Sequence, residues 1–310
     1  MAMVHLRVVC PADIAEQAVR LLSEREGVVA VGAGRLAENE AGSVVVHADL
    51  ARECADATLR ELKRLGVTTD GMITLDPIDT ALGDLVERAE HDAPGEGADA
   101  VVWDELAVRT GEDSQLTWTF GTFMVLATLL ASIGIMTDSP ITIVGAMVVG
   151  PEFGPLAGLA VGLVRRRPAI ARRASIALLI GFPLAILGAA AFTLVARGAG
   201  LISADVLDGH RQTEFIYHPG WFSFITAIVA GTAGMLSLTS TKSAALVGVF
   251  ISVTTIPAAG NVAVAAVLKD WYESGQSLLQ LGINLIGIVV AGSVTLAVRS
   301  SNATVTRFLR

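Results

Sequence analysis

The chain has 310 residues, of which 53% are hydrophobic and only 17% charged, and its mean hydropathy is +0.62. Because an average soluble domain carries about 25% charged residues, part of this chain is expected to lie in lipid. The formal net charge of −8 argues against nucleic acid as a partner, since nucleic acid binds to basic surfaces.

The charge is unevenly distributed along the chain. Residues 1–115 hold 23 Asp and Glu against 10 Lys and Arg, whereas residues 116–310 hold 7 against 12. This difference predicts an acidic, water-soluble front part and an apolar, mildly basic remainder. Cys10 and Cys54 have no framework spacing, so they are expected to be buried thiols in a reducing compartment. The N-terminus does not have the pattern of a signal peptide.

The front part has the hydrophobic patterns of a small α+β domain. Alternating and helical spacings predict strand, helix, strand, strand, helix and strand in that order, which is the ferredoxin-like (ACT-like) arrangement. We expect this cytoplasmic domain in residues 1–78 and an acidic helical connector in 79–115. The predicted elements are 3–10, 13–25, 28–36, 43–50, 51–66 and 71–77.

His5 and His47 fall on two strands that this arrangement places side by side. Two histidines suggest a metal or ligand pocket, but no carboxylate or cysteine spacing supports a metal. The sequence therefore favours histidines at the surface or at the edge of the core, and it predicts no cofactor.

The remainder, residues 116–300, is expected to form a membrane domain of six spans, followed by a tail at 301–310. Each apolar segment is close to the roughly 20 residues that cross a hydrocarbon core of about 30 Å. The predicted spans are about 116–136, 141–164, 174–196, 221–241, 243–268 and 276–298.

Basic residues orient the six predicted spans. The cluster RRRPAIARR (165–173), Lys242 between the fourth and fifth spans, and Arg299, Arg307 and Arg310 after the sixth all fall on one side. The positive-inside rule makes that side cytoplasmic. The sequence therefore predicts a multi-pass protein of the cytoplasmic membrane whose N-terminal domain and C-terminus are both cytoplasmic.

The first three predicted spans overlay the last three when the sequence is shifted by 103 residues, without a gap. Each unit has an odd number of spans, so the second unit must run opposite to the first. This is an inverted-topology repeat, a common plan of secondary transporters. The shift pairs Trp118 with Trp221, Ala127 with Ala230, and Gly145 with Gly248.

One carboxylate, Glu152, lies within the second predicted span and is surrounded by helix-breaking residues. The corresponding part of the fifth span contains Pro257, Gly260 and Asn261. Paired interruptions of this kind indicate broken helices around a midplane site, and a carboxylate at that depth needs a partner or a cavity. The candidate site for an ion or small polar solute comprises Gly150, Pro151, Glu152, Pro155, Ser252, Thr254, Thr255, Pro257, Asn261 and Asn284.

A purely structural interpretation of the same segment is also open. Gly154, Gly158 and Gly162 form a GxxxGxxxG stripe, which lets helices pack closely. This stripe, together with a ferredoxin-like domain that can pair through a sheet edge, predicts a homo-oligomer, either a dimer or a trimer.

Two segments resemble a known family. SPITIVGAMVVGPEFGPLAGLAVGL (139–163) and STKSAALVGVFISVTTIPAAGNVAVA (240–265) are similar to the prokaryotic membrane family catalogued as domain of unknown function 389 (DUF389). The resemblance covers about 115–300, and the N-terminal domain is similar to that of many members. Many members have a serine–proline pair followed by Leu-Met where this chain has residues 150–153, so the resemblance implies that Glu152 belongs to a subgroup.

Three classes of function follow from the sequence. A transporter or channel is favoured by the repeat, the paired interruptions and Glu152. A membrane scaffold or sensor is the first alternative, and a lipid-acting enzyme is weaker because the chain has no catalytic motif such as HExxH or GxSxG. The partners expected in every case are membrane lipids and further copies of the chain.

Overall fold

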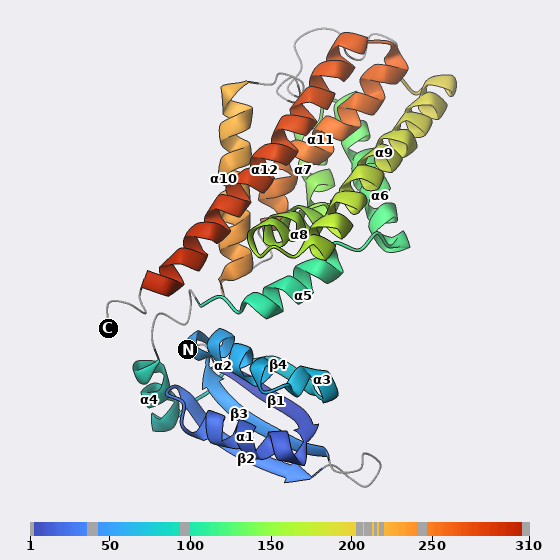
Figure 1. Ribbon diagram of the computed structural model, residues 1–310. Helices are drawn as coiled ribbons and strands as arrows, with labels where there is room; N and C mark the ends of the chain where they lie inside the picture. The colour runs from blue at the N-terminus through green and yellow to red at the C-terminus, as the bar shows by residue number, and fades with distance from the viewer. Residues whose placement is uncertain are drawn as a thin grey trace. The chain divides into compact units, whose positions relative to one another are not determined.

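The computed structural model describes residues 3–35, 43–93, 100–202, 207, 213, 216, 220–240 and 247–305, without the side chains of 247–254 and 301–305. The chain divides into two compact units. One comprises Met1–Leu106, Thr239–Lys242 and Asn302–Arg310, and the other comprises Ala107–Leu238 and Ser243–Ser301 (Figure 1). Lys242, Arg307 and Arg310, which were used to orient the spans, lie outside the described residues.

The first unit contains a four-stranded antiparallel sheet with helices. The strand order is β2-β3-β1-β4, so β1 lies between β3 and β4 and pairs antiparallel with both. The four strands and the two longer helices follow the predicted order, and a short helix at Val67–Asp70 that was not predicted precedes the last strand. The elements are β1 (Met3–Pro11), α1 (Ala12–Ser23), β2 (Val28–Arg35), β3 (Ser43–Ala51), α2 (Arg52–Arg64), α3 (Val67–Asp70) and β4 (Met72–Ile78).

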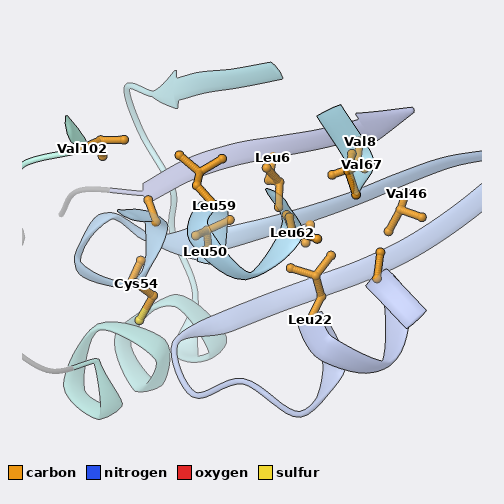
Figure 2. Packing of buried hydrophobic residues seen from close by; sticks show 14 of the residues in the cluster. Leu6, Val8, Leu22, Val46, Leu50, Cys54, Leu59, Leu62, Val67 and Val102 are labelled. Carbon is orange, nitrogen blue, oxygen red and sulfur yellow. The ribbon is translucent and has the colours of Figure 1, made fainter. Parts of the chain in front are cut away.

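The core of this unit lies between one face of the sheet and its helices. Alternate residues of β1, including Leu6 and Val8, are buried, as the twofold periodicity of a strand requires. Leu22 of α1 and Leu62 of α2 point toward the same core (Figure 2). The apolar stripes of two amphipathic helices therefore cover one side of the sheet.

Cys10 and Cys54 are free thiols and both are buried, as predicted. Burial raises the pKa of each thiol, and the nearby carboxylates of Asp13 and Glu53 raise the pKa of Cys10 and Cys54, respectively, further. Both thiols therefore stay protonated, and slow to react, at neutral pH.

His5 and His47 lie on neighbouring strands, and their ring centroids are 6.4 Å apart. His5 Nδ1 lies 2.6 Å from Asp49 Oδ1. Among the described residues, no group of three or more His, Cys, Asp and Glu side chains is arranged to hold a metal ion.

The connector contains two helices, α4 (Asp84–Asp92) and α5 (Trp103–Asp113). Ion pairs join the start of α5 to α2: Arg52 to Glu105 at 3.0 Å and Lys63 to Asp104 at 2.8 Å. The division between the two units falls within α5, after Leu106. The compact first unit thus includes connector residues beyond position 78.

The second unit is built of apolar helices. Within the part of the chain that the structure describes, four helices are long and apolar enough to cross a membrane: α6, α9, α10 and α12 up to Ser300. Gly181 and Gly188 of α9 lie against Phe120 and Val125 of α6, where a larger side chain would not fit. The helices of this unit are α6 (Trp118–Met136), α7 (Pro140–Val149), α8 (Phe153–Val164), α9 (Pro168–Gly198), α10 (Trp221–Thr239), α11 (Val247–Leu268) and α12 (Trp271–Val305).

The second and fifth predicted spans differ from simple straight helices. The second is the pair α7 and α8, bent by 54°, and it brings the candidate spans to five when it is counted as one. The fifth is α11, whose apolar stretch Thr255–Leu268 is shorter than the other spans within the described residues. The total of six spans therefore stays a prediction.

We expect residues 1–106, expressed alone, to give a soluble domain that unfolds cooperatively. Leu50 is fully buried in β3, so Leu50→Ala should lower the free energy of unfolding by about 2–5 kcal/mol in urea titrations. The exposed Arg20→Ala, which removes only a surface ion pair with Glu16, should change it by less than about 1 kcal/mol. An insoluble product, or equal effects of both substitutions, would contradict this assignment.

Candidate functional site

The break between α7 and α8 follows from three residues. Gly150 ends α7 in an extended conformation, with ψ of 126°. Pro151 has no N–H to continue the helix, and Pro155 is tolerated because it lies in the first turn of α8, where amides have no helical partner. The predicted interruption of the second span is therefore present.

Glu152 lies at this break and is completely buried. It directly precedes the first residue of α8. Its Oε1 accepts a hydrogen bond of 2.8 Å from Thr255 Oγ1 of α11. Other helix threonines, such as Thr128 and Thr193, donate instead to the carbonyl four residues earlier. The hydroxyl of Thr255 instead donates to the Glu152 side chain of another helix segment.

The surroundings of Glu152 offset the cost of placing a carboxylate in a membrane. That cost is about 2.5–3.5 kcal/mol on an insertion scale. A hydrogen bond to a charged group contributes about 1.5–3 kcal/mol, and a negative charge at a helix N-terminus gains about 0.3–1 kcal/mol. The free energies contributed by the Thr255 hydroxyl and by the N-terminus of α8 are thus together about as large as this cost.

The remaining residues of the predicted site are not all gathered around Glu152. Gly150, Pro151 and Pro155 flank it in sequence, and Thr255 contacts it, whereas Asn261 takes part in a different cluster. Asn284 of α12 is buried and lines a cavity with Gln280. The side chains of Ser252 and Thr254 lie outside those that the structure describes.

The predicted second break, at Pro257–Asn261, does not occur. Helix α11 continues through Pro257 from Val247 to Leu268. A single proline removes one backbone hydrogen bond, and in a membrane helix neighbouring groups can compensate for it. Helix α9 continues through Pro183 in the same way. The prediction of two broken helices was therefore wrong for the fifth span.

A second buried polar cluster joins the end of α11 to the start of α12. Asn261 Nδ2 donates to Glu273 Oε1 at 2.8 Å and to Ser277 Oγ at 2.9 Å. Ser274 Oγ donates to the Val262 carbonyl at 3.1 Å. Glu273, which is 4% exposed, was missed because the sixth span was predicted to begin after it. The recurrence of polar residues at helical spacing from Glu273 onward was the available signal.

A cavity of about 390 Å³ lies between α10 and α12. Its polar lining comes from Ser223, Gln280 and Asn284, and its apolar lining includes Trp221 and Phe224. Gln280 Nε2 donates to Ser223 Oγ at 3.2 Å. The cavity is large enough to hold several water molecules.

The glycine stripe of α8 packs within this chain. A side chain at Gly154 would overlap Asp113, one at Gly158 would overlap Ser114, and one at Gly162 would overlap Ala171. Gly154 and Gly158 therefore lie against the end of α5 and the residue that follows it, and Gly162 lies against α9. The close helix packing predicted for the stripe is thus used inside the second unit, between residues of one chain.

Several long apolar helices, a bent helix pair and buried polar groups between them define a multi-pass membrane protein. Residues 147–290 match the family model described as Domain of unknown function (DUF389), and this segment belongs to that family. The match includes the break at Glu152, all of α8 to α11 and the first twenty residues of α12. Comparisons with curated proteins and with solved structures gave no match.

We expect Gly158→Ala to lower the stability of the second unit. The added methyl group would overlap the Ser114 side chain and lie 3.0 Å from the Thr110 carbonyl, so backbone must move. Overpacking of this kind costs about 1–3 kcal/mol. Gly145→Ala in α7 is the matched control, because a methyl group there meets nothing within 4 Å. The unfolding temperatures of both variants in detergent measure the difference in stability. Equal unfolding temperatures would contradict the packing role of Gly158.

Proposed function

We propose that this protein moves a small cation or polar solute across the membrane through a site at Glu152. The observation that carries the proposal is a fully buried carboxylate at a helix break, hydrogen-bonded to a second apolar helix. Many transporters build their site at mid-membrane around discontinuous helices, and here the α7–α8 pair supplies one such break. An ionisable side chain buried in a membrane is a functional-site hypothesis by default.

Helix boundaries support the predicted repeat of 103 residues. Helices α6 and α10 both have 19 residues and begin at Trp118 and Trp221. Helices α9 and α12 begin at Pro168 and Trp271. Each pair of starting residues has the same separation as Glu152 and Thr255, which is 103 residues.

Backbone geometry supports the same repeat. The turn between α8 and α9 contains Arg166 with φ of 52°, and the turn between α11 and α12 contains Lys269 with φ of 69°. Non-glycine residues rarely adopt positive φ, so a chance coincidence at equivalent positions is improbable. The equivalent hydrogen bonds in the two turns are Arg167 N to Gly162 O and Asp270 N to Ala265 O, each 2.9 Å long.

Helix directions and packing contacts are consistent with an inverted relation. In Figure 1, α6 and α9 run from the lower to the upper end of the second unit, whereas α10 and α12 run from the upper to the lower end. The contact of Gly121 with Leu184 between α6 and α9 has its counterpart in Phe224 and Gly287 between α10 and α12. Each half would thus present the same helices in the opposite direction.

The repeat would fix the depth of Glu152. Thr255 is the residue equivalent to Glu152, and the two side chains are hydrogen-bonded to each other. Two equivalent residues can touch only where the twofold axis between the halves passes. In an inverted repeat that axis lies in the membrane plane, near its middle. The pair would therefore lie at mid-membrane, where alternating access requires its site.

The remaining predictions on architecture belong to this proposal. The strand order of the first unit supports a ferredoxin-like domain. The arginines at 165–173 support an orientation with this domain and the C-terminus in the cytoplasm. A homo-oligomer stays a prediction, and the stripe of α8 gives it no further support because its contacts are intrachain.

We expect Glu152→Gln to abolish transport by the full chain in liposomes. The amide keeps the shape and the hydrogen bond from Thr255 but cannot bind a cation by charge. The measurement is the flux of H⁺, Na⁺ or K⁺ into liposomes loaded with a dye specific for each ion. Thr255→Val should weaken the apparent affinity about tenfold, because it removes one hydrogen bond to a charged group.

Glu16→Gln is the control, since Glu16 is an exposed residue of the first unit that should leave flux unchanged. Flux of wild-type rate in Glu152→Gln would contradict the site. Flux that never exceeds that of empty liposomes, for wild type and all three ions, would contradict cation transport.

A further inference from the structure

Four polar side chains form a stripe along one face of α12: Glu273, Ser277, Gln280 and Asn284. At about 100° per residue, their spacing keeps all four on the same side of the helix. None of the four is more than 4% exposed. Polar side chains are expensive in a membrane-spanning helix, and a buried row of them points to a pathway.

The stripe has contacts with two other helices. Asn261 of α11 bridges Glu273 and Ser277 through hydrogen bonds of 2.8 Å and 2.9 Å. Gln280 bonds to Ser223 of α10 through its amide nitrogen, while its buried Oε1 accepts no hydrogen bond from the described residues. Gln280 and Asn284 both line the cavity of about 390 Å³. The stripe thus leads from a hydrogen-bonded cluster into a space that can hold water.

The far end of the stripe lies at the depth of Glu152. Helices α11 and α12 are antiparallel neighbours joined at Lys269 and Asp270, and the bond between Asn261 and Ser277 fixes their register. Thr255 and Asn284 are equally far from this turn, about 20 Å at 1.5 Å per residue. Asn284 therefore lies at the same level as Thr255, which bonds to Glu152.

The stripe is present in only one of the two halves. The positions 103 residues earlier, on α9, hold Ile170, Ala174, Ala177 and Gly181, none of which has a polar side chain. Packing alone therefore does not require polar residues here, because apolar and small ones occupy the equivalent helix. Since the halves run in opposite directions, the stripe opens toward one face of the membrane only.

We propose that the α12 stripe is a one-sided path by which a small cation reaches the depth of Glu152 from the membrane face where α11 ends and α12 begins. The carboxylate of Glu273 lies at the outer end and favours cations over anions. The side-chain oxygens of Ser277, Gln280 and Asn284 replace water around the cation as it descends. This inference rests on the proposed transport function and names its route and its charge selectivity.

Accessibility of single cysteines in the full chain tests the path without measuring transport. Ser277→Cys and Gln280→Cys are labelled in membrane vesicles of either orientation with membrane-impermeant methanethiosulfonates, one cationic and one anionic. Wild type is the blank, because its own two cysteines are buried thiols of raised pKa. Ala174→Cys and Ala177→Cys are matched controls at the equivalent positions of α9.

We expect both stripe variants to be labelled from one face only, and about tenfold faster by the cationic reagent, because a charged cleft concentrates counter-ions. Adding Glu273→Gln should remove that preference. The α9 controls should stay unlabelled from both faces. Asn284→Cys is an additional stripe variant, to be used if size-exclusion chromatography shows that Ser277→Cys or Gln280→Cys is misfolded.

Labelling from both faces, no labelling of well-folded stripe variants, or equal labelling of the α9 controls would overturn the path. If the stripe is labelled from one face but the protein carries no ion flux, the stripe is a water-accessible cleft and the transport function is wrong. Flux that depends on Glu152, together with an unlabelled stripe, would instead retain the function and place its route elsewhere.

Discussion

The hydrogen bond between Thr255 and Glu152, 2.8 Å long, is the constraint on which the membrane unit depends. A carboxylate with 0% exposure must be compensated at the place where it is buried. Compensation requires α11 to lie against the break and requires the N-terminus of α8 to begin at Glu152. The break, the glycines that let α8 approach its neighbours, and the position of α11 are therefore parts of one arrangement.

In the proposed repeat, the two halves differ at the position where they would meet. The shift that pairs Glu152 with Thr255 pairs Pro151 with Thr254, so the second half retains an amide where the first half has none. Helix α11 can consequently stay continuous, whereas the first half breaks. Under the proposed repeat and function, Glu152 belongs to one half only and the α12 stripe, with Glu273, to the other, and these differences would give the two faces of the membrane different access to the site.

Patterning predicted the strands and longer helices of the first unit and four of the long apolar helices of the second, because burial in a sheet, a helix or lipid imposes a period or a length on the sequence. It also predicted the break around Glu152, since adjacent glycine and proline leave a helix few alternatives. It failed at Pro257, because one proline does not decide between a kink and a break without knowledge of the neighbouring helices. It missed Glu273 for a related reason: only tertiary contacts with Asn261 bury that residue at the end of a span.

The proposed inverted repeat is tested most directly by finding on which side of the membrane its two corresponding turns lie. Arg166 and Lys269 are both exposed and have the same backbone conformation. Arg166→Cys and Lys269→Cys would be labelled with an impermeant thiol reagent in intact cells and in inverted vesicles. We expect labelling of position 269 only in intact cells and of position 166 only in inverted vesicles. Labelling of both positions from the same side would contradict the inverted repeat and, with it, the placement of Glu152 at mid-membrane.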